Sequence, residues 1–313
     1  MTRSETGGGW LFAYFREVHG GTVLEESLHY ALSRDGRTFT ALAGNTPVWQ
    51  ATVDGQSVPL RDPFVARGLD GRYHLLATRA VPAQRQPDGR YHRIGMGFAP
   101  HSGPADLLHA TSDDLITWQD VSIAPVLRDV PAAKNLWAPE FVPDAQHGDH
   151  LVIWSSSVGP KMWWDKAIWC ARTRDFVTYT APRVLFDPNL NVIDAHIVPH
   201  ADGYYLFYKP DSHDDTKHVN VAVSANLDGP YETVTVGATP TITEGPHVVW
   251  RDDLHEWWMY YDHPWEKRYG LSTSKDLRSW TPLEGGSFPE DARHASVLRL
   301  TEEEYERLAR AWA

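Results

Sequence analysis

The sequence predicts an all-β fold, a five-bladed β-propeller, and two observations lead to this prediction. The first is a turn motif, Ser/Thr-x-Asp-x-x-Ser/Thr-aromatic, which recurs along the chain after alternating apolar stretches. The second is a series of strand-like segments that open with an acidic residue and lead into an aromatic-rich run. A unit that recurs along a chain indicates stacked supersecondary structure, and units of four short strands form the blades of a propeller.

Four copies of the turn motif begin at Ser33, Ser112, Thr173 and Ser274, and a longer fifth copy begins at Ser224. Asp and Ser side chains bond to nearby backbone in such segments and so favour a turn, and the aromatic residue starts the next strand. Five copies in 313 residues predict blades of about 60 residues. These are longer than compact blades of ~40 to 45 residues, which indicates long connecting loops.

Acidic residues open three of the predicted inner strands, and a related segment opens a fourth. The segments are Arg61-Asp62-Pro63, Ile193-Asp194-Ala195, Glu244-Gly245-Pro246 and Trp137-Ala138-Pro139-Glu140. In a fold whose repeats surround an axis, residues at the start of each inner strand come to a common centre. The sequence therefore predicts one active site built from carboxylates that are far apart in the chain.

The two ends of the chain predict how the propeller closes. No acidic inner strand precedes the first turn motif, whereas an orphan strand, residues 293–300, follows the last one. We expect this C-terminal strand to become the innermost strand of the N-terminal blade, which removes an open edge. Thr301 is expected to cap a short surface helix whose first turn holds Glu302 to Glu304. Residues 1–313 are thus expected to form a single domain.

Composition limits the classes of partner and substrate that are expected for this chain. The formal charge is −12, so a nucleic acid is not an expected partner, and neutral substrates fit better. The chain holds 14 Trp and 13 Tyr, whose rings can pack against sugars, although many must belong to the core. Its one cysteine, Cys170, allows no internal disulfide and reads as a buried strand residue. Residues 1–9 lack a secretory signal pattern, and no apolar stretch reaches the ~20 residues of a membrane span, so a cytoplasmic location without membrane contact is expected.

The four acidic segments, in this order and one blade apart, resemble those of glycoside hydrolase family 43, five-bladed propellers that hydrolyse arabinose- and xylose-containing glycans with inversion. The resemblance covers nearly the whole chain. It implies that Asp62 is the general base, Glu244 the general acid, and Asp194 the residue that orients the acid and adjusts its pKa. Ala195 and Ala295 stand where Pro and Gly are common in the family, which bears on the sugar specificity and leaves the reacting groups in place.

Inversion requires one carboxylate that deprotonates water and one carboxylic acid that protonates the leaving oxygen, about 6.5 to 9.5 Å apart. The acid must hold its proton near neutral pH, so we expect the negative charge of Asp194 to raise the pKa of Glu244. Glu140 is read as occupying the register of Asp62 on the second blade. Because the resemblance implies no reacting group there, Glu140 is interpreted as structural or adjacent to the substrate.

Six residues are candidates for substrate contacts: Trp137, Glu140, His196, His247, Trp163 and Trp265. For the two histidines an ordinary strand role is an equal alternative. His294 is expected on the axis, where the resemblance implies a bound Ca²⁺ in the central channel. Imidazole is a poor ligand for a hard cation, so contact through water is expected, and a metal-free axial histidine stays open.

The function expected from these residues is an inverting, exo-acting glycosidase that releases terminal pentose, α-L-arabinofuranose, from plant-type oligosaccharides. A β-D-xylosidase or endo-arabinanase of the same fold is an alternative, as is a non-catalytic glycan-binding propeller. A carboxylate separation of about 5 to 5.5 Å would favour a retaining enzyme. An Arg and Lys cluster around the water site would favour a phosphorolytic one. The segments 81–105, 157–166 and 211–217 are expected to shape the mouth of the site.

Overall fold

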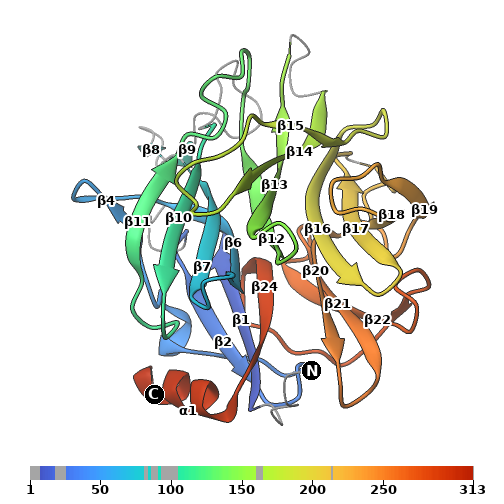
Figure 1. Ribbon diagram of the computed structural model, residues 1–313. Coiled ribbons are helices and arrows are strands. Elements are labelled where there is room, and N and C mark those ends of the chain that lie inside the picture. The colour runs from blue at the N-terminus through green and yellow to red at the C-terminus, as the bar shows by residue number, and fades with distance from the viewer. Residues whose placement is uncertain are drawn as a thin grey trace.

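Five four-stranded antiparallel sheets surround a central axis, which confirms the five-bladed β-propeller (Figure 1). The computed structural model describes residues 8–17, 26–80, 84–85, 91–92, 105–159, 165–212 and 214–312. Four blades run in chain order from the innermost strand outward, and the fifth combines the two ends of the chain.

The strands of the first four blades are given from the axis outward. Blade 1 contains β6 (Leu60–Arg67), β7 (Tyr73–Arg79), β10 (Leu107–Ser112) and β11 (Gln119–Ala124). Blade 2 contains β12 (Trp137–Asp144), β13 (Asp149–Ser157), β14 (Lys166–Thr173) and β15 (Arg183–Phe186). Blade 3 contains β16 (Val192–His200), β17 (Gly203–Pro210), β18 (Asn220–Ser224) and β19 (Glu232–Thr235). Blade 4 contains β20 (Glu244–Arg251), β21 (Glu256–His263), β22 (Arg268–Ser274) and β23 (Thr281–Pro282).

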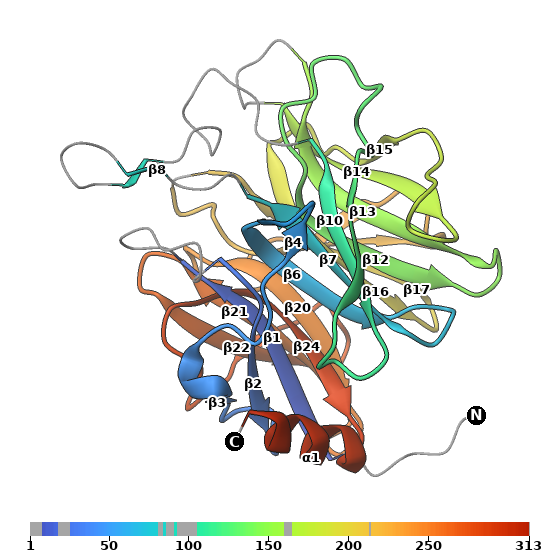
Figure 2. The same ribbon diagram turned by 90° about the vertical axis from the view of Figure 1, so that its left-hand side faces the viewer.

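Blade 5 closes the ring as the sequence predicts. Its strands are β24 (Ala292–Leu300), β1 (Gly9–Arg16), β2 (His29–Ser33) and β3 (Thr40–Ala41). The C-terminal strand β24 is innermost and pairs antiparallel with β1, with Leu298 opposite Leu11. Helix α1 (Glu302–Ala311) follows directly and lies at one end of this blade in both views (Figures 1 and 2). Thr301 caps it through a capping box with Glu304, as expected.

A few short elements lie outside the blades. They are the 3₁₀ turn η1 (Ala43–Asn45) and the two-stranded pairs β4 (Thr52–Val53) with β5 (Gln56–Ser57) and β8 (Gln84–Arg85) with β9 (Tyr91–His92). Most of the predicted loop 81–105 lies outside the described residues.

The recurring turn motif joins the third and fourth strand of each blade. In its four regular copies the aspartate accepts hydrogen bonds from the backbone N–H groups two and three residues later, at 2.7 to 2.9 Å; these aspartates are Asp35, Asp114, Asp175 and Asp276. The carboxylate thereby satisfies donors that the turn leaves outside any strand ladder. This is why the motif marks blade ends so regularly.

The hydrophobic core is divided into five clusters, one between each pair of neighbouring blades. Between blades 1 and 2, for example, Phe64 and Leu76 pack with Phe141 and Trp154. Strands buried on both faces read as nearly continuous apolar runs, which fits β13 and β1. The clusters hold the blades at fixed angles, so the inner strands meet at the axis in a defined register.

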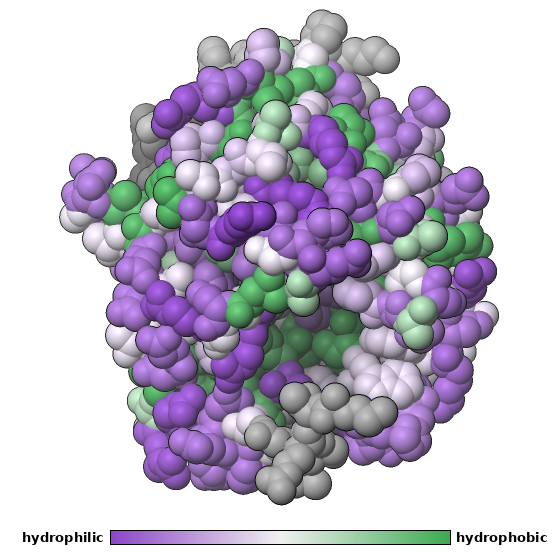
Figure 3. All heavy atoms as spheres, viewed as in Figure 1, coloured by the Kyte–Doolittle hydropathy of each residue, from purple (hydrophilic) through white to green (hydrophobic). Residues whose placement is uncertain are grey.

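The face seen in Figure 1 is mainly hydrophilic, and apolar side chains show in a hollow near its centre (Figure 3). Within the described residues, no helix has the length and apolar character needed to cross a bilayer.

The turn motif yields a stability prediction. Asp175→Ala should lower the free energy of unfolding by about 1 kcal/mol, because two backbone N–H groups lose their acceptor, as when a helix loses its N-cap. The neighbouring substitution Arg174→Ala, at an exposed position of the same turn, is the matched control and should change little. Urea denaturation measures both; equal stabilities of the two variants would show that the aspartate does not hold the turn.

Candidate active site

Each of the five inner strands carries one residue with left-handed backbone at the point where its pairing register shifts. These residues, here called the first ring, have φ between 33° and 60° and are Asp62, Ala138, Asp194, Gly245 and His294. A bulge of this kind adds one residue to the strand and redirects its side chains. Left-handed backbone costs about 1 to 3 kcal/mol for most residues other than glycine and clusters at functional sites.

The register shift corrects the interpretation of Glu140. Ala138, and not Glu140, is equivalent to Asp62, because the bulge on β12 falls between Trp137 and Glu140. Glu140 belongs instead to a second ring, two residues further along each inner strand. The members of this second ring are Phe64, Glu140, His196, His247 and Ser296.

Asp62 is partly buried and hydrogen-bonded. Thr78 Oγ1 donates to its Oδ2 at 2.6 Å, and His294 Nδ1 lies 3.0 Å from its Oδ1. Burial alone would raise the pKa of Asp62, but the charge and hydrogen bond of His294, the charge of Arg61 and the hydrogen bond from Thr78 together outweigh it and lower the pKa to about 2. The carboxylate is therefore ionised at neutral pH, which is the state that a general base needs.

The imidazole of His294 lies between Asp62 and Glu244. Its Nε2 is 3.3 Å from Glu244 Oε1, on the side of the ring opposite the 3.0 Å contact with Asp62. Asp194 and Asp262 also lie within 4.0 Å of Nε2. Burial lowers the pKa of His294, but the four nearby carboxylates raise it well above 6.5, so the ring carries a positive charge. Asp62 and Glu244 are thus separated by the width of one ring and its two contacts.

Glu244 is surrounded by cations. Lys209 Nζ contacts its Oε2 at 2.7 Å, Lys217 Nζ contacts the same oxygen at 2.9 Å, and Arg293 donates to its Oε1. Burial raises the pKa of Glu244, but the charges of Lys209, His294 and Arg293 lower it well below 4.5. The expectation of a raised pKa at Glu244 is therefore wrong in the substrate-free protein, because these cations outweigh the nearby Asp194.

Lys209, Lys217 and Arg293 were not predicted as site residues, although Lys217 ends the segment 211–217 that was expected at the mouth of the site. Lys209 ends the aromatic run of β17 and is only 1% exposed. Its position at the end of a strongly apolar strand could have indicated a buried ion pair, since lysine is almost never buried without a partner. Arg293 directly precedes the predicted axial histidine. Lys217 lies in a loop, and its sequence context carries no comparable signal.

Asp194 lies beside Glu244, as predicted. One oxygen or nitrogen from each of Asp194, Glu244 and His294 lies within 4.8 Å of the others. The backbone N–H of Gly245 donates to Asp194 Oδ2 at 3.3 Å, so Asp194 also fixes the chain next to Glu244. Burial raises the pKa of Asp194, and the charges of His294 and Lys209 only partly offset this.

Hydrogen bonds join neighbouring blades at the site. In blades 1 to 4 the donor or acceptor is the residue of the second strand that lies opposite the bulge of the inner strand. Thr78 accepts the N–H of Ala138 at 2.8 Å, and Ser155 accepts that of Asp194 at 3.1 Å. In blade 3 the equivalent residue is Lys209, which donates to Glu244. In blade 4 it is Asp262, which accepts a hydrogen bond from the N–H of His294 at 3.1 Å. Blades 1, 2 and 4 thus each hold the first-ring residue of the next blade, and blade 3 holds Glu244 beside Gly245.

A small cavity of about 30 Å³ lies on the axis between the two rings. This is room for about two waters. Its polar lining comes from Asp62, Glu140, Asp194, His294 and Ser296. His294 Nε2 is buried there without a hydrogen-bond partner among the described residues.

Of the predicted substrate contacts, Trp265 is 61% exposed, and Lys217 Nζ lies 5.9 Å from the centre of its ring. Because Lys217 also contacts Glu244, Trp265 stands near the mouth of the site. Trp137 is half-buried and opens β12. Glu140, His196 and His247 are gathered in the second ring, and Trp163 lies outside the described residues. Their roles in substrate binding stay predictions.

Comparisons with solved structures agree with the five-bladed fold. A thermostable family-43 glycoside hydrolase matches with a TM-score of 0.55 and 18% identity over 79% of this chain and 81% of the other. A Podospora anserina α-L-arabinofuranosidase, solved with cellotriose, matches with a TM-score of 0.52 and 14% identity over 76% and 71%. A family-43 enzyme from Xanthomonas citri, solved with xylotriose, matches with a TM-score of 0.55 and 14% identity over 75% of each chain. At these identities the likeness shows the fold.

No curated protein matches the chain. A family model described as a probable glycosyl hydrolase domain matches residues 5–306, nearly the whole chain. With the four ordered acidic segments and the five-bladed fold, this match establishes that the chain belongs to the glycosyl hydrolase family related to glycoside hydrolase family 43.

Proposed function

We propose that this glycosidase inverts configuration and releases terminal pentose, α-L-arabinofuranose, from short oligosaccharides. The observation that carries the proposal is the placement of Asp62 and Glu244 on opposite sides of the His294 ring. Ionised Asp62 would deprotonate the attacking water, and Glu244 would protonate the leaving oxygen. Asp194, bound to the N–H of Gly245, would orient Glu244.

The low pKa of Glu244 sets a condition on this mechanism. In the substrate-free site Lys217 neutralises Glu244 and also stands over Trp265. A sugar that packs on Trp265 would separate Lys217 from Glu244 and exclude water. Both changes raise the pKa of the carboxyl group and allow it to carry the proton for the leaving group.

We also propose Ca²⁺ on the axis near His294. The residues fit a hard cation, because Asp62 and Asp194 present carboxylates to the axial cavity. The charged ring of His294 would reach the ion through water. Such an ion would supply positive charge among the carboxylates and help to fix the first ring.

The choice of sugar is guided by the structural neighbours. Two of them are α-L-arabinofuranosidases, and another was solved with xylotriose. A β-D-xylosidase or endo-arabinanase therefore remains the alternative within the family. A non-catalytic glycan-binding propeller is disfavoured by the two carboxylates, Asp62 and Glu244, that face each other across the axial His294. Phosphorolysis is disfavoured because Lys209, Lys217 and Arg293 contact Glu244 and not the base Asp62.

The assignment of acid and base predicts loss of activity in Asp62→Asn and in Glu244→Gln, with the fold retained. Each change keeps the shape of the side chain and removes its proton-transfer function, typically worth ~10²- to 10⁴-fold. On nitrophenyl glycosides Glu244→Gln should be partly spared, because that leaving group needs less protonation. Wild-type turnover of an oligosaccharide by either variant contradicts the assignment.

The cation cluster predicts a pH effect. Lys217→Met removes a positive charge 2.9 Å from Glu244 Oε2, so the pKa of Glu244 should rise. The alkaline limb of the kcat/KM profile reports the acid, and it should therefore move to higher pH. Lys275→Met, at an exposed lysine whose ion pair is with Glu256, is the control and should leave the limb in place. A limb that moves to lower pH in Lys217→Met would argue against Glu244 as the acid.

Anomeric configuration tests the role of Asp62. Proton NMR during the first turnovers should show a product anomer opposite to that of the substrate bond, because water and not Asp62 attacks the sugar. Retained configuration would make Asp62 a nucleophile.

The exo mode predicts the products of a linear arabino-oligosaccharide digest. Monosaccharide should appear at the earliest times in chromatography. A ladder of intermediate oligomers without monomer would instead support an endo-arabinanase, and xylose release from xylo-oligosaccharides alone would support the xylosidase.

A further inference from the structure

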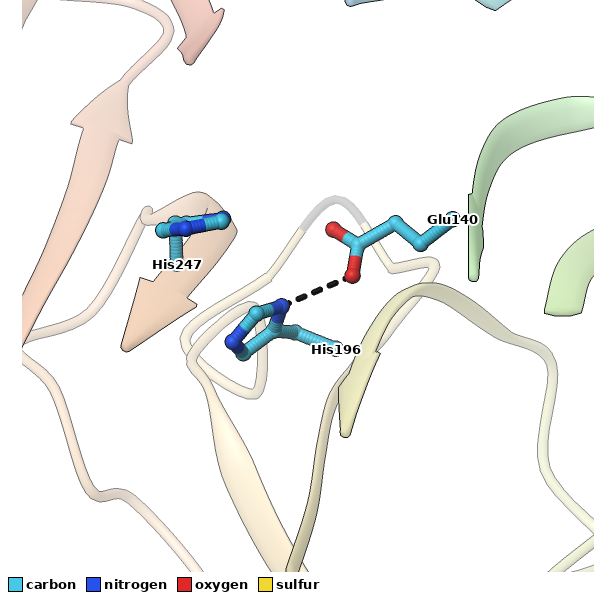
Figure 4. Close-up of side chains that lie close together, drawn as sticks. All are labelled: Glu140, His196 and His247. Carbon is cyan, nitrogen blue, oxygen red and sulfur yellow. Dashed lines mark hydrogen bonds and ion pairs between the residues drawn. The ribbon is translucent and has the colours of Figure 1, made fainter. Parts of the chain in front are cut away.

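Three members of the second ring form a group of metal-binding side chains apart from the proposed reaction centre. Glu140 on β12, His196 on β16 and His247 on β20 come from consecutive blades and converge on the axis (Figure 4). One ligand atom of each lies within 4.8 Å of the others. Phe64 and Ser296 complete the ring and offer no comparable donor. The bulges of the first ring give the three side chains this common level, because each follows its bulge by two residues.

Hydrogen bonds to neighbouring backbone fix the two imidazoles. His247 Nε2 lies 3.1 Å from the carbonyl oxygen of Val297, and His196 Nε2 lies 3.4 Å from that of Val248. In the neutral ring the nitrogen that faces a carbonyl carries the hydrogen, which leaves Nδ1 with a lone pair. This outer hydrogen bond is the arrangement that orients metal-binding histidines. His196 Nδ1 already points at Glu140 Oε2, 2.7 Å away (Figure 4).

The two histidines of the cluster are buried, and Glu140 is partly buried. His196 and His247 are 6% and 7% exposed, and their rings are 4.4 Å apart between centres. Without a metal, one shared proton must join Glu140 to His196, while His247 only packs beside them. A divalent cation in place of that proton would satisfy all three side chains together.

We propose that Glu140, His196 and His247 bind a divalent transition metal of the zinc class. Two imidazole nitrogens and one carboxylate are the donors that zinc prefers, whereas Ca²⁺ requires six to eight oxygens, so the site differs from the axial calcium proposed above. Zinc bonds of about 2.0 to 2.2 Å place tetrahedral ligand atoms roughly 3.3 to 3.6 Å apart. Three atoms that lie within 4.8 Å of one another can therefore reach one ion after small side-chain rotations. Three protein ligands leave a fourth position, and water from the adjoining axial cavity, which Glu140 lines, can fill it.

The test uses the full chain, freed of metal by dialysis against a chelator and titrated with Co²⁺ as a spectroscopic substitute for Zn²⁺. We expect one Co²⁺ per chain with the intense visible absorption of four-coordinate cobalt. Zn²⁺ should abolish the absorption at one equivalent, and a large excess of Ca²⁺ should leave it unchanged. The readout does not involve glycosidase activity, so its result is independent of the proposed function.

Variants locate the site. His247→Asn and Glu140→Gln should each weaken Co²⁺ binding at least about ten-fold, a loss typical of a disturbed metal site. His147→Ala is the matched control, because His147 forms a histidine–carboxylate pair with Asp144 on the surface, 2.7 Å apart, and should bind like the wild type. Circular dichroism shows whether each variant is folded. If one variant does not fold, the Co²⁺ absorption of the wild-type protein still tests whether the metal binds.

Several results would overturn the proposal. They are the absence of four-coordinate absorption in the wild type, displacement of Co²⁺ by Ca²⁺, and unchanged affinity in folded His247→Asn or Glu140→Gln. Any of these would leave Glu140 and His196 as an ion pair beside a packed histidine.

Discussion

The structure of the site depends on charge compensation among carboxylates that the propeller forces together. Asp62, Asp194, Glu244 and Asp262 all lie within 4.0 Å of one imidazole, that of His294. Buried carboxylates repel one another unless cations are placed among them. His294, Arg293 and Lys209 meet this requirement, and each is paired with more than one acid. Arg293 and Lys209 are buried, and His294 is partly buried. Removing one partner of such a network leaves an uncompensated buried charge, so its members depend on each other.

The fivefold repeat supplies the geometry on which this network rests. Every inner strand has its bulge at the same level, and in blades 1 to 4 the opposite residue of the second strand bonds to the next blade. The bulge position and the position opposite it therefore carry different side chains in each blade. In blade 1 they are the base Asp62 and its hydroxyl donor Thr78, and in blade 3 the opposite position is Lys209, which bonds the acid Glu244. The strain of left-handed backbone at Asp194 and His294 is maintained by these contacts between blades. Asp62 is held by Thr78 of its own blade and by His294 of blade 5.

Much of this architecture could be predicted from local patterns. The turn aspartates, the orphan C-terminal strand and the Thr301 cap each depend on residues close in sequence, and all appear as expected. The acidic segments pointed to the axis for the same reason. The bulge could not be predicted, because it depends on how a strand pairs with its neighbour, and the register of Glu140 was consequently wrong. The state of Glu244 was also missed, since Lys209 and Lys217 reach it from a different blade and a loop.

A crystal structure of the Asp62→Asn variant with a bound oligosaccharide is the most direct test of the claim that the axis is the reaction centre. The account predicts a terminal sugar whose anomeric carbon faces residue 62, with its glycosidic oxygen in hydrogen-bond contact with Glu244 and with Lys217 displaced from that carboxyl group. A sugar bound away from the axis, or a glycosidic oxygen in contact with Glu140 and not with Glu244, would contradict it.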